Sequence, residues 1–193
     1  IGGDHLISLP ILRALAKDKP VGMFQFDSHS DTWDTYFGDF KYTHGTPFRR
    51  AIEEGLINPN KYVILGLRGG LYDPDDLKWA IDQGITIIST DKFYEIGMKE
   101  TIKIIKDVLD DTLTYFTFDI DGIDPTFAPG TGTPEVGGIN VREAQLIIRH
   151  LNSLNFIGAD VVEVSPPFDV NNMTSLVGAT IAFEILCTMT KTN

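Results

Sequence analysis

Five short runs of apolar residues, set among segments with helical character, most strongly limit how this chain can fold. The runs are rich in β-branched and aromatic residues and lie at 21–26, 62–67, 85–88, 113–118 and 156–164. They are mostly continuous rather than alternating, which is typical of parallel strands covered on both faces. Helix-like segments lie at 8–17, 46–55, 75–83, 91–109, 141–153 and 173–190. This alternation predicts an α/β fold with a mainly parallel sheet.

Length and composition favour a single domain over residues 1–193. Of the 193 residues, 42% are hydrophobic and 22% are charged, as expected for a globular domain with one sizeable core. The chain begins with Ile1 and enters a glycine loop within two residues, with no strand before that loop. We therefore expect one domain that is truncated at its amino terminus.

Charge and cysteine content limit the partners and the compartment. The net charge of -11 and the lack of a basic patch argue against nucleic acid, whose phosphates would be repelled, and favour a cationic substrate or metal ion. No stretch approaches the roughly 20 apolar residues that a membrane span requires. The single Cys187 cannot form an internal disulfide, and its apolar neighbours predict a core position. We expect a soluble cytoplasmic protein.

Acidic residues follow three of the predicted strands. Asp27, Asp119 and Glu163 each lie at or near the carboxyl end of an apolar run. Ligands bind beyond these ends in open parallel sheets, so the three residues are expected at one edge of the sheet. The long connections 27–45 and 119–140 follow two of the same strands, and long ordered loops in compact domains are usually functional.

Six aspartate and histidine residues are candidate metal ligands. Asp119 and Asp121 lie two residues apart, a spacing that places both on one face of a strand. Crowded carboxylates repel one another and need a counter-charge, most simply a divalent metal. The candidate set is His5, Asp27, His29, Asp31, Asp119 and Asp121. These nitrogen and oxygen ligands suit two Mn²⁺ ions, although Ni²⁺ and Co²⁺ remain open, and such a pair can activate water for hydrolysis.

Five segments resemble the ureohydrolase family of arginases and agmatinases. They are Gly-Gly-Asp-His at 2–5, Phe-Asp-Ser-His-Ser-Asp at 26–31, Phe-Asp-Ile-Asp-Gly-Ile-Asp-Pro at 118–125, Ala-Pro-Gly-Thr-Gly-Thr-Pro-Glu at 128–135 and Glu-Val-Ser-Pro-Pro-Phe-Asp at 163–169. The resemblance implies a three-layer α/β/α fold, two Mn²⁺ per subunit, hydrolysis of a guanidino group to urea and an amine, and a homo-oligomer, either a trimer or a hexamer. The six candidate ligands fall on the family's metal-ligand positions. His44 matches its proton-shuttling histidine, and Glu163 matches the carboxylate that holds the guanidinium.

Departures from the arginase pattern point to the agmatinase branch. Arginases typically have an Asn where this chain has Trp33, and carboxylates where it has Gly69-Gly70-Leu71, so the usual partners of an amino-acid substrate are missing. We therefore expect agmatine as the substrate, with putrescine and urea as products in polyamine biosynthesis, and Trp33 at the substrate entrance. Guanidinobutyrase, guanidinopropionase and other amidinohydrolase activities remain alternatives.

Two further alternatives are a non-catalytic relative that binds a polyamine or a partner protein, and a zinc deacylase of related fold. A degenerate relative is expected to lose metal ligands, yet none of the six positions is lost. A deacylase is expected to use one metal and fewer carboxylates, whereas this chain has the paired sets Asp27/Asp31 and Asp119/Asp121. Both features favour the metal-dependent hydrolase.

Overall fold

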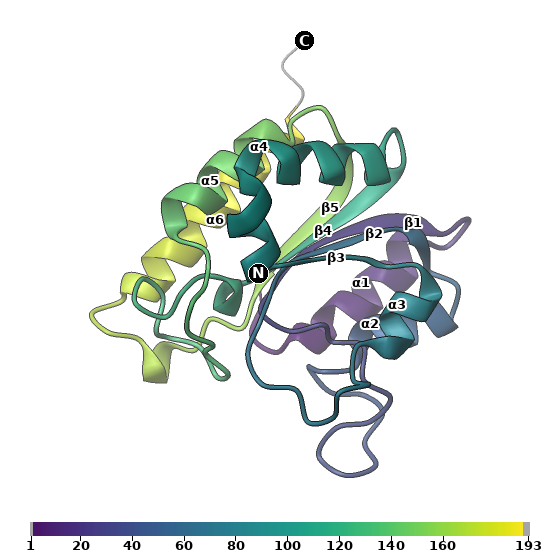
Figure 1. Cartoon of the computed structure of the whole chain (residues 1–193), viewed down its shortest axis with the longest axis horizontal. Helices are drawn as coiled ribbons and strands as arrows, with labels where there is room; N and C mark the ends of the chain where they lie inside the picture. Colours follow the sequence, from purple (N-terminus) through teal and green to yellow (C-terminus); the bar gives the residue numbers. More distant parts are fainter. Residues whose placement is uncertain (1, 191–193) are drawn as a thin grey trace.

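One five-stranded sheet organises residues 2–190, the part of the chain that the computed structural model describes (Figure 1). The strands are β1 (Val21–Phe26), β2 (Ile57–Leu67), β3 (Thr86–Ser89), β4 (Leu113–Asp119) and β5 (Asn155–Val162). Their order is β3-β2-β1-β4-β5, and every neighbouring pair is parallel. The predicted α/β fold with a parallel sheet is confirmed.

Helices cover both faces of the sheet and make three layers (Figure 1). One face carries α4 (Thr90–Leu109), α5 (Val141–His150) and α6 (Met173–Met189); the other carries α1 (Ser8–Leu15), α2 (Pro47–Glu53) and α3 (Lys78–Gln83). Successive strand residues point to opposite faces, so Phe24 packs in one core and its neighbour Met23 in the other. Both faces are buried, which explains why the apolar runs are continuous.

Several element boundaries differ from the sequence-based prediction. Strand β2 begins at Ile57, five positions before the predicted start at 62, because its first part contains polar and partly exposed residues that gave no apolar signal. Three short 3-10 helices were not predicted: η1 (His5–Ile7), η2 (Ile120–Gly122) and η3 (Pro166–Phe168). Helix α4 is kinked at Gly97, whose φ of 78° and ψ of 162° are not helical.

The predicted core position of Cys187 is wrong, because its side chain is exposed. Helix α6 is apolar around most of its circumference, and Ile181 and Ile185 make its core face. Phe183 and Leu186 point outward like Cys187, and these two residues are 65% and 62% exposed. Sequence alone did not show which side of so apolar a helix would be buried. No helix within residues 2–190 is both long and apolar enough to cross a membrane.

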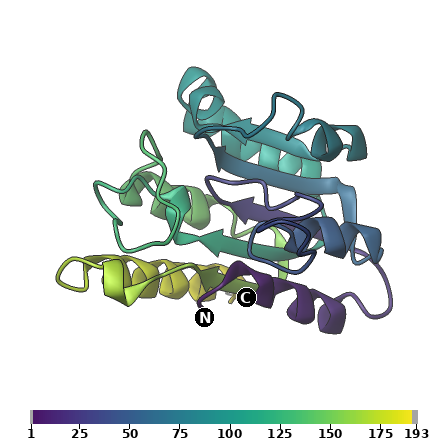
Figure 2. The same ribbon diagram turned by 90° about the horizontal axis from the view of Figure 1, so that it is seen from below.

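The order of the strands creates a crevice at their carboxyl ends. Strands β2 and β3 lie on one side of β1, whereas β4 and β5 lie on the other, so the direction of winding reverses between β1 and β4. The connections that leave β1 and β4 diverge at such a point and leave room for a ligand. The long segment after β4 lies beyond the carboxyl ends of the strands (Figure 2).

Candidate metal centre

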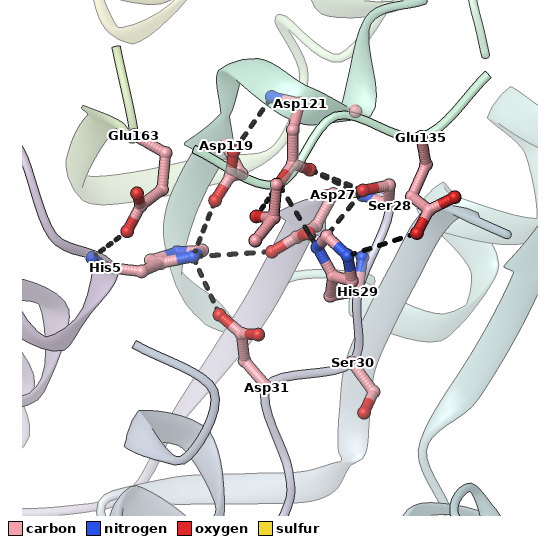
Figure 3. Close-up of polar contacts among 12 residues, drawn as sticks. His5, Asp27, Ser28, His29, Ser30, Asp31, Asp119, Asp121, Glu135 and Glu163 are labelled. Atoms are coloured by element: carbon pink, nitrogen blue, oxygen red, sulfur yellow. Dashed lines mark hydrogen bonds and ion pairs between the residues drawn. The ribbon is translucent and has the colours of Figure 1, made fainter. Parts of the chain in front are cut away.

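The candidate ligands converge at this crevice from four segments of the chain (Figure 3). Asp27 directly follows β1, Asp119 ends β4, and Glu163 directly follows β5. His5 reaches the same place because the segment before it runs along the end of β5. The Gly2 N–H donates to the Val161 carbonyl at 3.1 Å, and the Gly3 carbonyl accepts from the Glu163 N–H at 2.8 Å.

A first group of possible ligands surrounds Nδ1 of His5. This atom lies 3.3 Å from Asp27 Oδ2, 2.9 Å from Asp31 Oδ2 and 3.1 Å from Asp119 Oδ2 (Figure 3). This nitrogen is buried and has no hydrogen-bond partner with suitable geometry. Ligand atoms of His5, Asp27 and Asp119 lie within 4.8 Å of one another. A nitrogen lone pair among three carboxylate oxygens is a donor set that fits a divalent cation.

A second group shares Asp27 with the first. Ligand atoms of Asp27, His29 and Asp121 also lie within 4.8 Å of one another. His29 Nδ1 is 3.1 Å from Asp121 Oδ2 and 3.7 Å from Asp27 Oδ1. Because Asp27 belongs to both groups, its carboxylate lies where it could serve two neighbouring ions. The donor set therefore fits a pair of metals.

Asp119 and Asp121 converge, but the strand spacing that we predicted is not the reason. Asp119 is the last residue of β4, whereas Asp121 lies in the 3-10 helix η2. Asp119 caps that helix, and its Oδ1 accepts from the Asp121 N–H at 2.8 Å. The tight turn, rather than a shared strand face, brings the two carboxylates to the same centre.

Burial and mutual repulsion control the electrostatics of the centre. Burial, together with the charges of Asp31 and Asp121, raises the pKa of Asp27 to about 7. Burial and the neighbouring aspartates likewise raise the pKa of Asp119 well above its ordinary value. Carboxylates whose ionisation is this costly need cationic partners, and divalent metals are the strongest available.

Two histidines lie directly against these carboxylates and can supply positive charge in a metal-free protein. Burial opposes the charge on His29, but its hydrogen bonds with Asp121 and Asp27 raise its pKa to about 12. Burial would raise the pKa of Asp121, but hydrogen bonds from His29 and Ser28 lower it to about 2. Burial also opposes the charge on His5, yet Asp119 and Asp31 raise its pKa well above the usual range. Metal binding would replace the protons that these imidazoles hold.

Glu163 and His44 lie beside the centre, on the side of Asp4. Glu163 Oε1 accepts from the His5 backbone N–H at 2.6 Å, and burial raises the pKa of the Glu163 carboxyl. His44 Nδ1 lies 3.7 Å from Asp4 Oδ2, and its interaction with Asp4 raises the pKa of the imidazole. Asp4 also accepts from the Leu6 N–H at 2.8 Å and caps η1. An acid and a base thus face one cavity.

That cavity has a volume of about 190 Å³, below the roughly 300–1,000 Å³ of pockets for drug-sized ligands. Its walls contain His29, Asp31, Asp119, Asp121, His44 and Glu163, together with the predicted entrance residue Trp33. Trp33, Tyr36 and Tyr72 form an aromatic wall, with ring centroids of Trp33 4.9 Å from Tyr36 and 5.4 Å from Tyr72. The cavity fits a small molecule with an apolar middle.

Several residues at the site were not predicted from sequence. Tyr36 and Tyr72 line the cavity from loops separated by 36 positions, and nothing in the sequence pairs them. Glu135 stands in a segment that we quoted for the family resemblance, but its place in the cavity wall had no separate signal. Arg68 donates hydrogen bonds to the carbonyls of Asp121 and Glu135, both at 2.7 Å, and so fixes the loop that carries Asp121.

Comparisons with known proteins show the family to which the chain belongs. A model of the Arginase family matches residues 1–188. A guanidinopropionase from Pseudomonas aeruginosa is 56% identical over 187 residues, which are 97% of this chain and 59% of that protein. The mitochondrial agmatinase of Gallus gallus is 43% identical over 190 residues, 98% of this chain and 56% of that protein. The chain thus spans less than three fifths of the length of these two curated relatives.

A solved structure supports the same relationship. The proclavaminate amidino hydrolase of Streptomyces clavuligerus superposes with a TM-score of 0.90 at 39% sequence identity, over 97% of this chain and 62% of that one. The three-layer α/β/α fold implied by the sequence resemblance is therefore confirmed.

Proposed function

Because the chain belongs to the arginase family, we propose that the protein that contains it hydrolyses the guanidino group of a small linear compound to urea and an amine. The observation that carries this proposal is a cluster of six aspartate and histidine side chains beside one small cavity. Four of them, His29, Asp31, Asp119 and Asp121, line that cavity together with Glu163 and His44, and His5 and Asp27 complete the two donor groups behind it. A planar cationic substrate suits this acidic cavity. Membership of the family supports this reaction class, and the cavity contains groups suited to it.

We propose that two Mn²⁺ ions are held by His5, Asp27, His29, Asp31, Asp119 and Asp121. The support is the pair of donor groups that share Asp27 and the buried, unpartnered Nδ1 of His5. The mixed nitrogen and oxygen donors also accept Ni²⁺ and Co²⁺. When bound, a pair of divalent cations supplies the activation of a water molecule for attack on carbon.

Glu163 and His44 would act on the substrate itself. The Glu163 carboxylate pairs with the planar N–H donors of the guanidinium, and the His5 N–H holds one of its oxygens in place. The water oxygen bonds to the guanidino carbon, and the bond from that carbon to the amine nitrogen breaks. The two protons that the water loses as urea forms end on the amine, which leaves as an ammonium ion. His44 donates a proton to the departing nitrogen and takes one from the water oxygen in return. Its interaction with Asp4 raises its pKa, which favours the protonated form.

The far end of the substrate decides between two candidates. The 56% identity with a guanidinopropionase favours 3-guanidinopropionate, which has a carboxylate there. The hydroxyl oxygens of Tyr36 and Tyr72, 3.5 Å apart in the cavity wall, are neutral donors suited to that carboxylate. Agmatine, our expectation from sequence, has an ammonium group instead and would rest on the face of Trp33. We place 3-guanidinopropionate first and agmatine second.

The test is urea release by the whole protein loaded with Mn²⁺. The panel contains 3-guanidinopropionate, agmatine, 4-guanidinobutyrate, arginine and guanidine. We expect the highest kcat/KM for 3-guanidinopropionate, whereas a higher value for agmatine would restore the assignment made from sequence. If no compound is hydrolysed while two metals are bound, the hydrolase proposal is wrong and a non-catalytic, polyamine-binding relative is favoured.

We propose that the whole protein forms a trimer or hexamer, as the sequence resemblance implies. We also propose that it is cytoplasmic, which its single cysteine supports. Sedimentation equilibrium of the whole protein and fractionation of its native cells test these two statements. A monomer at micromolar concentration would contradict the first, and recovery in a membrane or secreted fraction would contradict the second.

A further inference from the structure

A row of buried polar side chains crosses the sheet beneath the metal centre. Gln25 in β1, Thr117 in β4 and Asp160 in β5 are register partners on neighbouring strands. All three are buried, with exposed fractions of 0%, 0% and 3%. Burying a polar group is costly unless it is hydrogen-bonded, so we expect these three side chains to have hydrogen-bond partners and a role in the protein. Among the described residues, neither Thr117 nor Asp160 belongs to the groups that could hold a metal.

Hydrogen bonds from three hydroxyl groups stabilise the buried carboxylate of Asp160. Its Oδ1 accepts from Thr117 Oγ1 at 2.6 Å. Its Oδ2 accepts from Ser8 Oγ and from Tyr115 Oη, both at 2.5 Å. Three donors converge on this carboxylate, which therefore acts as the acceptor in all three contacts.

The direction of the Thr117 hydrogen bond determines which ring nitrogen of His5 carries a proton. Thr117 has one hydroxyl proton, and that proton points to Asp160. The hydroxyl oxygen therefore presents only lone pairs to His5 Nε2, which lies 2.7 Å away. A hydrogen bond over this distance requires a proton on Nε2. In a neutral imidazole the lone pair is then on Nδ1, the atom that faces the carboxylates of the first metal group.

We propose that Thr117 and Asp160 are positioning residues of the metal centre, which fix the ring orientation and tautomer of His5 so that its Nδ1 lone pair meets the metal. Without them, the ring could rotate. Alternatively, when the imidazolium loses one proton, the remaining proton could stay on Nδ1, where it would hydrogen-bond to Asp31 and block the site. Outer partners of ligating histidines typically change metal affinity by about 10- to 100-fold when they are removed. This inference rests on the proposed metal centre but not on the identity of the substrate.

The test is a titration of the metal-free whole protein with Mn²⁺, in which electron paramagnetic resonance measures the free ion. Thr117→Val removes the hydroxyl and keeps the shape of the side chain. We expect one of the two Mn²⁺ sites, the one built on His5, to weaken about 10- to 100-fold while the other is unchanged. Asp160→Leu is an independent variant with the same expected selective loss, because it removes the acceptor that orients the Thr117 proton.

Two control variants separate this role from a structural one. Thr117→Ser keeps the hydroxyl, and its Mn²⁺ affinities should stay within about threefold of the wild type. Ser8→Ala removes a different donor to Asp160 without touching His5, and both sites should remain tight. Wild-type affinity at both sites of Thr117→Val, or an equal loss in Ser8→Ala, would overturn the inference. Because no substrate is used, a wrong substrate assignment cannot produce either result.

Discussion

Two residues of the site hold backbone conformations that cost energy. Asp31 and Glu163 have φ values of 51° and 62°, in the left-handed region that side chains other than glycine rarely adopt. Each such residue costs on the order of 1–3 kcal/mol and persists only where the surrounding structure enforces it. Here the Asp31 carbonyl accepts from the Phe48 N–H at 3.2 Å, and the Glu163 N–H donates to Gly3. Both carboxylates are thereby aimed at the cavity.

The carboxylate of Glu163 should matter for substrate and not for metal. Glu163→Gln keeps the shape but loses the charge that pairs with a guanidinium, so we expect kcat/KM to fall by about 10- to 100-fold, the worth of a charged hydrogen bond. Metal content should stay at the wild-type level. Steady-state urea release beside metal analysis measures both quantities. Glu100→Gln, on the exposed surface of α4, is the matched control, and a loss of metal in Glu163→Gln would contradict the assigned role.

Substituting a proposed metal ligand should have the opposite effect on metal content and lower it. Asp119→Ala and His29→Ala each remove a ligand from one of the two groups, so both should bind fewer than two Mn²⁺ and lose turnover. Each substitution leaves one ion with fewer donor atoms, so that ion binds more weakly. Metal analysis after dialysis, with activity in the same samples, tests this. An Asp119→Ala protein with full manganese and full activity would disprove the centre; the exposed Asp107→Ala serves as control.

At the scale of secondary structure, Arg68 ties the end of β2 to the loop that follows β4. Its guanidinium donates to the carbonyls of Gly66, Asp121, Gly122, Ile123 and Glu135. Burial lowers the pKa of Arg68, while Asp121 and Asp124 nearby favour its charge. Asp124 supports the same loop, because its carboxylate accepts from the Gly137 and Gly138 N–H groups at 2.7 and 2.8 Å. The ligand loop is therefore held by side chains that do not themselves bind metal.

Arg68→Lys should loosen that loop. An ammonium group has three donors without a planar fork and cannot reach carbonyls on both sides of the loop. We expect unfolding free energy to fall by about 1–3 kcal/mol, because buried carbonyls lose their partners, and Mn²⁺ affinity at the Asp121 group to weaken. Urea denaturation and metal titration measure the two effects. Arg142→Lys, exposed on α5, should change neither; unchanged stability in Arg68→Lys would contradict the role of the guanidinium.

At the scale of the whole molecule, the proposed metal centre is expected to couple folding to pH. Burial and neighbouring charges raise the pKa of Asp27 from 3.8 to about 7 in the metal-free protein. Between these values the folded state holds more protons than the unfolded chain, so its stability falls as pH rises. The metal requires the ionised carboxylate, so its binding strengthens over the same range.

Thermal unfolding with Mn²⁺ or with a chelator, at about pH 5, 6.5 and 8, tests this coupling. We expect the Tm of the metal-free protein to fall as pH rises. The rise in Tm caused by Mn²⁺ should grow with pH and reach about 5–10 °C at a metal concentration near 100 times Kd. A metal-induced rise that shrinks between pH 5 and pH 8 would show that protons and metal do not compete for these ligands.

Much of the fold and of the candidate site could be predicted from local sequence. Within residues 2–190, the five strands and six α-helices were predicted near their observed positions, because buried parallel strands and apolar helix faces leave strong patterns in the sequence. The three 3-10 helices and the early start of β2 were missed, because short turns and exposed strand residues leave no clear hydrophobic pattern in the sequence. The exposed side of α6 was missed because an apolar helix does not reveal which face is covered.

The sequence by itself determined the order of strands and helices and the residue types that could bind metal, because both follow from local patterns and from the chemistry of side chains. Only the tertiary structure decided that Asp27 lies between two donor groups, that a 3-10 turn joins Asp119 to Asp121, and that Tyr36 and Tyr72 meet. The contacts of His5 with Thr117 and of Arg68 with Asp121 join residues more than 50 positions apart. Such contacts depend on how the strands are ordered in the sheet, which no local pattern records.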